Sequence, residues 1–520
     1  MDNGTTNYGG LPAWGRTLSR TPGNGVDERN DILWLAILFA LFRIMVPTWF
    51  QPFYSEFRFF MYPFMVLSNP EFMAGFGGRT ALPFLDYWLE YPPMFPWISV
   101  VVYKLHALVF GADVSPTQAM LFSRMMAVVI ALVDVGNLLL IYAVAKRIRN
   151  HAAAIRACVI YALLFFTLVV GNSYFDTFVL FTILLSLWAM TSGCVKLAAS
   201  AAGLGFMLKF IPLFFVPVAV KYAARLRRPN SDAPETPAEP DENTTPLFNP
   251  PAAASRSNVD LNRLITWFGV LVLTVGVLSA PFLYARNDLF VMPFKVAARR
   301  PGWETLQALS AGQINFGSVQ PTLNDVPSEK AYFEKVAKEN PKAAGFLAAT
   351  LTMGGTLGLQ PADRLRIASR FSTDISYLKR ASSPLMLPML VILGTLYAVA
   401  WFSMRREATP LNIVALSGVS AFTLLLASSG WSPQFITYVI PFLLLAFAPR
   451  VAVVMCLIVT LINFLEMPVW LGLNTVAKMG PEKVVWLLWA AVVLRSLFLV
   501  IASLMLFVTS LVSKPAESEA

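Results

Sequence analysis

The sequence is poor in charge, in cysteine and in histidine. Only 13% of its 520 residues are charged, whereas soluble domains carry roughly 25%. The three cysteines lie in or beside apolar segments without metal-ligand spacing, and neither of the two histidines has a partner at such a spacing. A soluble globular domain, a disulfide framework and a zinc site are therefore not expected.

Motifs for nucleotide and nucleic-acid chemistry are missing as well. The chain contains no GxGxxG, no GxxxxGK[ST] and no internal repeat. Its net charge of +10 comes from short basic clusters that flank apolar segments, which the positive-inside rule explains without a nucleic-acid partner. The first 30 residues are polar and glycine-rich, so we expect no cleavable signal peptide and predict that the first apolar span stays as an anchor.

What the chain does have is apolar length. Hydrophobic residues make up 57% of it, with 40 Phe, 13 Trp and 15 Tyr, as expected for a multi-pass membrane protein with aromatic belts. Runs near the roughly 20 residues that cross a bilayer predict an all-α polytopic bundle of about twelve spans. The predicted spans are 31–49, 122–145, 155–171, 175–192, two short ones within 194–223, 263–284, 386–404, 410–428, 433–448, 450–466 and 485–511.

The positions of the basic clusters predict the orientation. Clusters around Arg29, Lys146, Arg227, Arg405 and Arg450 all fall on the cytoplasmic side only if the apolar stretch 94–112 does not cross the membrane. We therefore expect that stretch to be a helix in the outer interface. Both termini are then cytoplasmic, and the protein is expected in the cell membrane.

This topology divides the chain into five parts. We predict a cytoplasmic tail (1–30), an N-terminal transmembrane module (31–228) with an outer loop at 50–121, and a cytoplasmic linker (229–260). A C-terminal transmembrane module (261–511) with an outer loop at 285–385 and a cytoplasmic tail (512–520) follow. The linker is rich in Pro, Ala and acids and is predicted to be disordered.

Acidic residues cluster in the first outer loop. Glu56 follows the first span among aromatic residues, where a carboxylate can act as a general base or simply balance Arg58. Asp86 and Glu90 precede Pro92-Pro93 and would share a face on a helix. They could bind a cation, bind sugar hydroxyls or supply an acid and a base; alternatively, they complement a helix dipole.

Two further polar positions interrupt apolar segments. Asp176 stands at the outer mouth of a predicted span, and Lys209 stands at the outer turn of the 194–223 hairpin. The ammonium could reach the interface or bind a phosphate. Asp134 and Asn137 lie deep in the second span; Arg124 is no obvious partner for Asp134, and its role, in helix packing or in function, stays open.

The second outer loop carries a basic cluster that the positive-inside rule does not explain. Basic residues beside an aromatic residue at this interface suit an anionic headgroup or a lipid phosphate. Near residue 431 a Ser-Pro-Gln corner begins an outer helix, as a cap or as a sugar-binding edge. The residues that we single out are Lys295, Arg299, Arg300, Trp303, Glu304, Gln313 and Gln434.

The order of these motifs resembles the GT-C superfamily of membrane glycosyltransferases. The motifs are SEFR (55–58), EYPP (90–93), an Arg124…Asp134…Asn137 span, NSYFD (172–176), LKFIPLFFVP (208–217), RRPGWETLQAL (299–309) and WSPQF (431–435). The pattern looks most similar to the polyprenol-phosphate-mannose-dependent mannosyltransferases of glycosyltransferase family 87. The resemblance implies a GT-C-like bundle with interfacial jaw helices in the first outer loop.

The resemblance also implies an inverting transfer of a sugar, mannose in that family, from a polyprenyl-phosphate donor to a lipid or glycan acceptor at the outer face. Glu56 matches the position of the family's general base, where the family more often has Asp, so Asp86 and Glu90 stay candidates. Four cations would bind the donor phosphate, which needs charge stabilisation as it leaves: Lys209, Lys295, Arg299 and Arg300.

Six residues are assigned to substrate binding: Arg58, Asp176, Trp303, Glu304, Gln313 and Gln434. No cofactor is identified, and a divalent cation stays open. Besides the donor and acceptor, the expected partners are membrane lipids.

A transporter or flippase of a lipid-linked or anionic solute is the alternative function, although such proteins usually place their acids near the bilayer midplane in two matching halves. A non-catalytic protein of envelope polymer assembly is a third reading, for which outward acids would be unnecessary.

Overall fold

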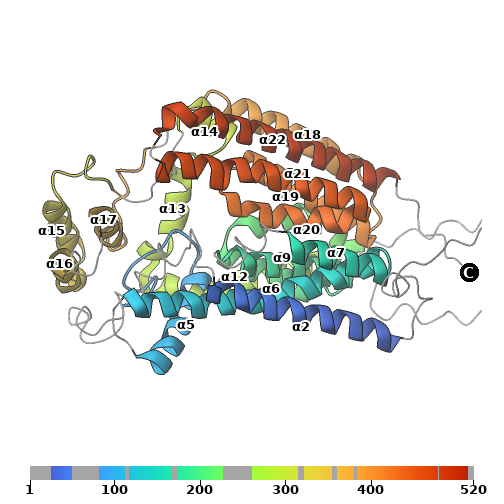
Figure 1. Ribbon diagram of the computed structural model, residues 1–520, viewed down its shortest axis with the longest axis horizontal. Helices are drawn as coiled ribbons and strands as arrows, with labels where there is room; N and C mark the ends of the chain where they lie inside the picture. Colours follow the sequence, from blue (N-terminus) through green and yellow to red (C-terminus); the bar gives the residue numbers. More distant parts are fainter. Residues whose placement is uncertain are drawn as a thin grey trace, which may run out of the picture.

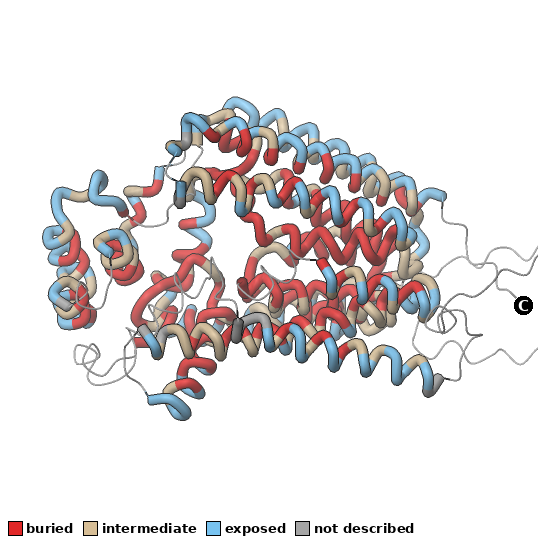
Figure 2. Tube along the Cα trace, viewed as in Figure 1, coloured by how far each residue is buried: buried red, intermediate tan, exposed pale blue. Residues whose placement is uncertain are grey.

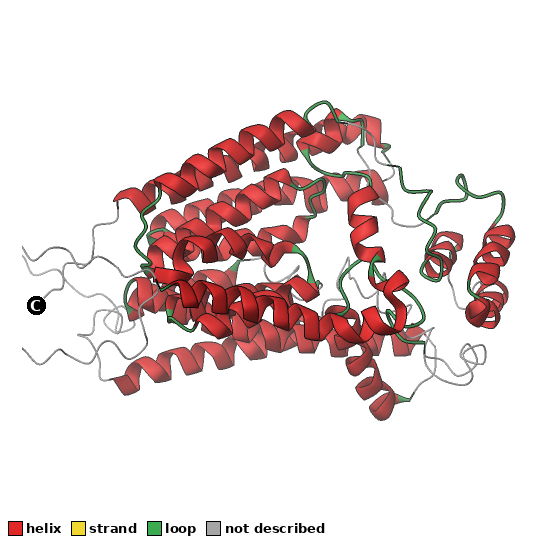
Figure 3. Cartoon of the chain, turned by 180° about the vertical axis from the view of Figure 1, so that it is seen from behind, coloured by secondary structure: helices red, strands yellow, loops and turns green. Residues whose placement is uncertain are grey.

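The computed structural model describes residues 25–49, 81–111, 116–164, 174–225, 260–313, 321–353, 360–379, 383–477 and 479–512. Within these ranges the chain is helical and contains no strand beyond two isolated bridges, as Figure 3 shows. The prediction of an all-α membrane protein is confirmed. Six described helices are long and apolar enough to cross a membrane, and shorter apolar helices accompany them.

Each of the twelve predicted spans overlaps one described helix. The helices are α2 (Gly25–Trp49), α6 (Pro116–Ile148), α7 (His151–Leu163), α9 (Asp176–Thr191), α10 (Val195–Leu208), α11 (Phe215–Tyr222), α12 (Leu261–Phe290), α18 (Met386–Ser403), α19 (Pro410–Ala427), α20 (Ile436–Ala446), α21 (Pro449–Phe464) and α22 (Pro481–Val512). Long helices such as α2, α21 and α22 run along the bundle in Figure 1.

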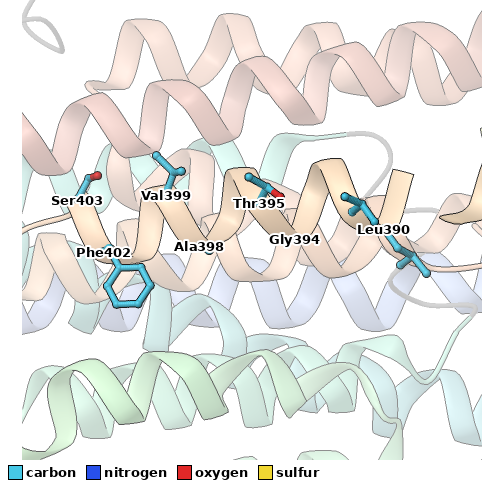
Figure 4. A pocket seen from close by; sticks show the side chains of 8 residues that line it. Leu390, Gly394, Thr395, Ala398, Val399, Phe402 and Ser403 are labelled. Carbon is cyan, nitrogen blue, oxygen red and sulfur yellow. The ribbon is translucent and has the colours of Figure 1, made fainter. Parts of the chain in front are cut away.

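The outer surface of the bundle is apolar. Figure 2 shows burial concentrated in the centre of the bundle and exposure along α2, α18 and α22. Helix α18 has no buried residue at all, although its composition is that of a core helix. A shallow groove runs along it from Leu390 past Gly394 to Phe402 (Figure 4). Because all the lining residues belong to one exposed helix, this groove is a lipid-facing surface rather than an enclosed site.

Basic residues gather at one end of the bundle, which we call the basic end. Lys146 donates to Glu28 at 2.6 Å, and Arg149 donates to the carbonyl of Leu444 at 3.4 Å. Arg405 donates to the carbonyl of Leu511 at 2.9 Å. The starts of α2 and α7 and the ends of α6, α20 and α22 therefore meet there. The positive-inside rule predicts that this end faces the cytoplasm.

Short helices gather at the opposite end, which we call the loop end (Figure 1). They are α5 (Met94–Phe110), α13 (Met292–Arg299), α14 (Leu306–Ser310), α15 (Glu329–Glu339), α16 (Ala344–Met353) and α17 (Pro361–Ser369). Helix α5, predicted to lie in the outer interface, is at this end. Helices α15 to α17 pack together beyond the bundle. Trp88 joins them to the rest, because its indole donates to the carbonyl of Ser372 at 2.6 Å.

Some helices end deeper in the bundle than others at the loop end, because the helices differ in length. At about 1.5 Å per residue, α9 with 16 residues and α10 with 14 span about 24 and 21 Å. Helix α6 with 33 residues spans about 50 Å. Helix α12 runs from Leu261 to a break in the helical backbone at Arg286, and this part spans about 38 Å. All four have one terminus at the basic end. The loop-end termini of α9 and α10, where Asp176 and Lys209 stand, therefore lie deeper than those of the longer helices.

An ion pair in the middle of the bundle answers the question that Asp134 raised. Its carboxylate accepts from Arg43 of α2, from the hydroxyl of Tyr161 at 2.6 Å and from Asn137 at 3.1 Å. Arg43 and Asp134 are almost fully buried. The partner is thus Arg43, on another helix, and the pair binds α2 and α7 to α6.

We predict that Arg43→Met destabilises the protein by about 3–5 kcal/mol, because it leaves the Asp134 carboxylate buried without its cation. Thermal unfolding in detergent measures the effect. Arg29→Met, on the exposed start of the same helix, is the matched control and should leave the unfolding temperature unchanged. Equal stability of Arg43→Met and Arg29→Met would contradict the prediction.

Candidate functional site

The segment 81–93 crosses the loop end as a series of turns and not as a helix. Asp86 and Glu90 therefore do not share a helical face. The Asp86 carboxylate accepts from the backbone N–H of Leu82 at 2.8 Å and closes a turn. Glu90 points elsewhere, toward Arg300 and Arg370 of the segment 285–385, which the sequence predicts to be an outer loop. Pro93 caps the N-terminus of α5, so the Pro-Pro pair begins a helix, as predicted.

Glu90 lies among three guanidinium groups, and we call the four residues the arginine cluster. Arg370 donates to one carboxylate oxygen of Glu90 at 2.6 Å, and Arg300 lies 3.9 Å from the other. Arg366 is the third cation that acts on this carboxylate. Burial by itself would raise the pKa of Glu90, but Arg370, Arg300 and Arg366 together hold that pKa below its ordinary value.

Tryptophan rings hold two of these arginines in place. The guanidinium of Arg300 lies 3.7 Å from the ring centre of Trp303, and that of Arg370 lies 4.6 Å from the ring centre of Trp88. Stacking on an aromatic face fixes the plane of a guanidinium and directs its N–H groups outward along the edges. The arginine cluster is therefore a rigid, positively charged site.

Lys209 and Asp176 form a second site at the recessed ends of α9 and α10. The ammonium donates to Asp176 at 2.7 Å, and the hydroxyl of Tyr438 donates to the same oxygen, Oδ1. Both charged side chains are almost fully buried. The cation neither reaches the interface nor stands unpaired, so its charge is balanced within the protein.

Four aromatic rings surround this pair, and we call them the aromatic box. The Nζ atom of Lys209 lies within 6 Å of every ring centre, with Phe435 nearest at 4.6 Å. The box consists of Tyr91, Phe175, Phe435 and Tyr438. Such enclosure stabilises the ammonium by cation–π attraction. The other carboxylate oxygen of Asp176, Oδ2, is buried and has no hydrogen-bond partner among the described residues.

The two sites are adjacent. Glu90 of the arginine cluster precedes Tyr91 of the aromatic box in the chain, and the ring centre of Tyr91 lies 5.2 Å from the Lys209 ammonium. Phe95 of α5 stacks on Phe175 at 4.1 Å and so fixes the first helix after this loop against α9. Because Glu90 and Tyr91 are consecutive residues, one ligand could contact both sites.

The sequence motifs RRPGWET and WSPQF pack directly on each other. Trp303 and Trp431 are joined by backbone hydrogen bonds of the two segments, among them Trp431 N–H to Trp303 C=O at 3.0 Å. A Cβ on Gly430 would lie 2.5 Å from the Trp303 ring, so only glycine fits there. Gln313 accepts from the N–H of Gly302 at 2.9 Å and holds the turn.

Glu304 belongs to a separate buried group. Arg495 of α22 pairs with Glu466, stacks 4.2 Å from the ring centre of Trp431 and donates to the backbone carbonyl of Glu304. Burial, and then the neighbouring Glu466 carboxylate, raise the pKa of Glu304 well above its ordinary value. Its carboxyl group is fully buried, so this predicted substrate-binding residue faces the interior.

The remaining predicted residues fall into three groups. Lys295 and Arg299 are exposed on α13, and neither side chain forms an ion pair with a described residue of the two sites. Gln434 is buried in the short 3-10 turn that begins α20. Glu56 and Arg58 lie outside the described residues, so their roles stay predictions.

Sequence reasoning missed several members of these sites. Glu466 and Arg495 had a detectable signal, because each is a charge inside an apolar run and must find a partner. Arg370 and Tyr438 had none, since each lies in a segment with ordinary polar or aromatic neighbours and becomes a site residue only through distant contacts.

The described residues contain no group of three or more His, Cys, Asp or Glu side chains that could hold a metal ion. The two described acids of the first loop are taken up by other partners: Asp86 by the turn at Leu82, and Glu90 by the arginine cluster. The described residues therefore do not form an all-protein ligand set for a metal ion.

No protein-family model matches the chain, and the curated proteins give no sequence match. Among solved structures, the chain resembles the oligosaccharyltransferase of Archaeoglobus fulgidus in its apo form, with a TM-score of 0.38 and 13% identity over 92% of this chain. The archaeal oligosaccharyltransferase AglB from Archaeoglobus fulgidus, in complex with an inhibitory peptide and a dolichol-phosphate, gives a TM-score of 0.38 and 13% identity over 94% of this chain. This chain covers 56% of each of those chains.

The pKa of Glu90 predicts a pH window for the cluster. Because that pKa is lowered in the folded protein, the ion pairs contribute their full stability above the ordinary value of 4.5 and lose it as the pH falls through the lower folded value. We expect Glu90→Gln to unfold at a lower temperature than the wild type between pH 7 and 5, and this difference to shrink below pH 4.5.

Thermal unfolding across that pH range tests the prediction. Glu334→Gln removes an exposed carboxylate of α15 and is the matched control, with no expected change in unfolding temperature. A difference between wild type and Glu90→Gln that persists unchanged to pH 3 would show that the ion pairs are not its source.

Proposed function

We propose that the protein is a membrane glycosyltransferase of the GT-C type that transfers a sugar from a polyprenyl-phosphate donor. One observation carries the proposal: a surplus of guanidinium charge lies beside an aromatic box with a buried carboxylate, at the loop end of an apolar helical bundle. A polyprenyl-phosphate sugar has the matching three parts, which are an anionic phosphate, a polar ring and an apolar tail.

The two sites fit the first two parts of that donor. Sugar pockets need apolar faces and a few well-placed polar groups, and the aromatic box supplies ring faces together with Asp176 Oδ2. The phosphate needs cations, and Lys209 has its charge balanced by Asp176, whereas Arg300 shares one carboxylate with two other arginines. The geometry therefore favours Arg300 over Lys209 as a phosphate ligand.

In the proposed reaction an acceptor hydroxyl attacks the anomeric carbon of the sugar. The bond from that carbon to the phosphate oxygen breaks, and polyprenyl phosphate leaves with the electron pair. A carboxylate base takes the hydroxyl proton, and the configuration at the anomeric carbon is inverted. Following the sequence resemblance, we assign the base to Glu56, with Asp86 and Glu90 as the alternatives.

The finer assignments rest on the sequence. Mannose as the sugar and a lipid or glycan acceptor follow from the resemblance. A site that faces outward from the cell membrane, both termini in the cytoplasm, and two transmembrane modules around the linker 229–260 follow from the apolar runs and the basic clusters. The gathering of basic residues at the far end of the bundle supports the orientation.

We expect purified protein to transfer mannose from polyprenyl-phosphate-mannose to a lipid acceptor extract, and Glu56→Gln to lower the rate by about 10²- to 10⁴-fold, the usual worth of a general base. Thin-layer chromatography of radiolabelled product measures it. Glu28→Gln, at the basic end, is the matched control and should retain full activity.

Other outcomes discriminate between the alternatives. Full activity of Glu56→Gln, with loss in Asp86→Asn or Glu90→Gln, would move the base to the first-loop pair. No transfer by the wild type with any polyprenyl-phosphate sugar would refute the assignment as a glycosyltransferase. Movement of the intact lipid-linked sugar across liposomes without transfer would establish the flippase alternative.

A further inference from the structure

The arginine cluster joins parts of the chain that are far apart in sequence. Glu90 comes from the loop before α5, Arg300 follows α13, and Arg370 follows α17. Both contacting arginines are stacked on tryptophans. The cluster thus ties the helices α15 to α17 to the bundle through charge.

The charges within the cluster do not balance. Three guanidinium groups act on one carboxylate, and the Glu90 and Arg370 side chains are 5% and 6% exposed. The Nη1 atom of Arg370 and the Nε atom of Arg300 are buried and have no hydrogen-bond partner among the described residues. Buried donors of a cation that have no acceptor cost free energy. The arginine cluster therefore has more N–H donors than acceptor atoms, and a ligand that supplied acceptors would stabilise it.

Glu90 lies at different distances from the two arginines. Its carboxylate makes a hydrogen bond of 2.6 Å with Arg370, but 3.9 Å separates it from Arg300. A carboxylate presents two oxygens and one negative charge. The monoester group of a released polyprenyl phosphate presents three terminal oxygens and a second charge near neutral pH, so two guanidinium forks can each bind it bidentately.

We propose that Arg300 and Arg370 form a phosphate clamp in which the Glu90 carboxylate occupies the place of a phosphate and competes with it. The ligand class is a phosphate ester, and under the proposed function, on which this inference rests, it is the phosphate of the polyprenyl donor or product. Arg370 thereby becomes a binding residue in addition to those predicted from the sequence.

The clamp has a consequence for Glu90 itself. When a phosphate takes both arginines, the carboxylate loses the cations that hold its pKa below its ordinary value, so its affinity for a proton rises. A bound donor would thus convert Glu90 from an ion-pair partner into a better proton acceptor. The clamp therefore links the two tasks, phosphate binding and proton uptake, that the sequence suggested for neighbouring residues.

Binding of farnesyl phosphate to the purified full-length protein in detergent, measured by calorimetry, tests the clamp without any sugar. Farnesol is the tail-only probe, and inorganic phosphate is the headgroup-only probe. We expect farnesyl phosphate to bind and farnesol to bind at least about tenfold more weakly, since farnesol cannot accept the hydrogen bonds of the two guanidinium groups. Inorganic phosphate should compete if the headgroup is the recognised part.

Variants separate the clamp from general charge attraction. Arg370→Gln should weaken farnesyl phosphate binding by about tenfold or more, and Arg370→Lys, which keeps the charge but loses the fork, should weaken it less. Glu90→Gln should tighten binding because it removes the competitor, a gain that misfolding cannot produce. Lys330→Gln, an exposed cation of α15 with a side chain 78% exposed, is the matched control and should not change binding.

The inference is overturned if farnesol binds as tightly as farnesyl phosphate, if Arg370→Gln binds as the wild type does, or if Glu90→Gln fails to tighten binding. Should Glu90→Gln not fold, Glu90→Asp, whose shorter side chain withdraws from Arg370, carries the same expectation. The two proposals fail separately. The expected binding pattern without sugar transfer supports the clamp and refutes the transferase, whereas transfer with unchanged binding in Arg370→Gln refutes the clamp alone.

Discussion

The structure depends on the cost of leaving a charge unpaired in an apolar bundle. Each of its buried cations described above meets a carboxylate that comes from another helix or loop: Arg43 meets Asp134, Lys209 meets Asp176, Arg370 meets Glu90 and Arg495 meets Glu466. Hydrophobic packing is a weak guide to register between helices that lie in lipid, because lipid tails are as apolar as the side chains. Paired charges supply that register instead.

These pairs differ in how completely they are satisfied. Asp134 receives hydrogen bonds from three side chains and serves packing. Asp176 keeps one buried oxygen without a partner, and the arginine cluster keeps unpartnered donors. Incomplete satisfaction of buried polar groups costs stability, and it occurs at the loop end, beside aromatic rings, where a ligand can supply the missing atoms. The chemistry of that ligand follows from what is missing: hydroxyl donors at Asp176, and anionic acceptors at Arg300 and Arg370.

Helix length has a part in forming the sites. Helices α9 and α10 are about half as long as α6 and are also shorter than the part of α12 before its break at Arg286, so Asp176 and Lys209 lie below the ends of the longer helices. This depth removes water from the ion pair and strengthens it. The loop 81–93 and the segments around Trp303 and Trp431 then pack over the recess. Gly302 and Gly430 allow these segments to approach each other closely, which gives a physical role to two of the sequence motifs.

The sequence by itself determined the helical class, the twelve apolar segments and the gathering of basic residues at one end, because hydrophobic length and charge sidedness are local properties. It also identified Asp176, Lys209, Glu90 and Arg300 as polar residues in places that need an explanation. Only the tertiary structure decided which of them meet. It paired Lys209 with Asp176, turned Glu304 inward and brought Arg370 to Glu90 from 280 positions away. Pairing between distant segments depends on how the helices pack, and no local pattern of residues records it.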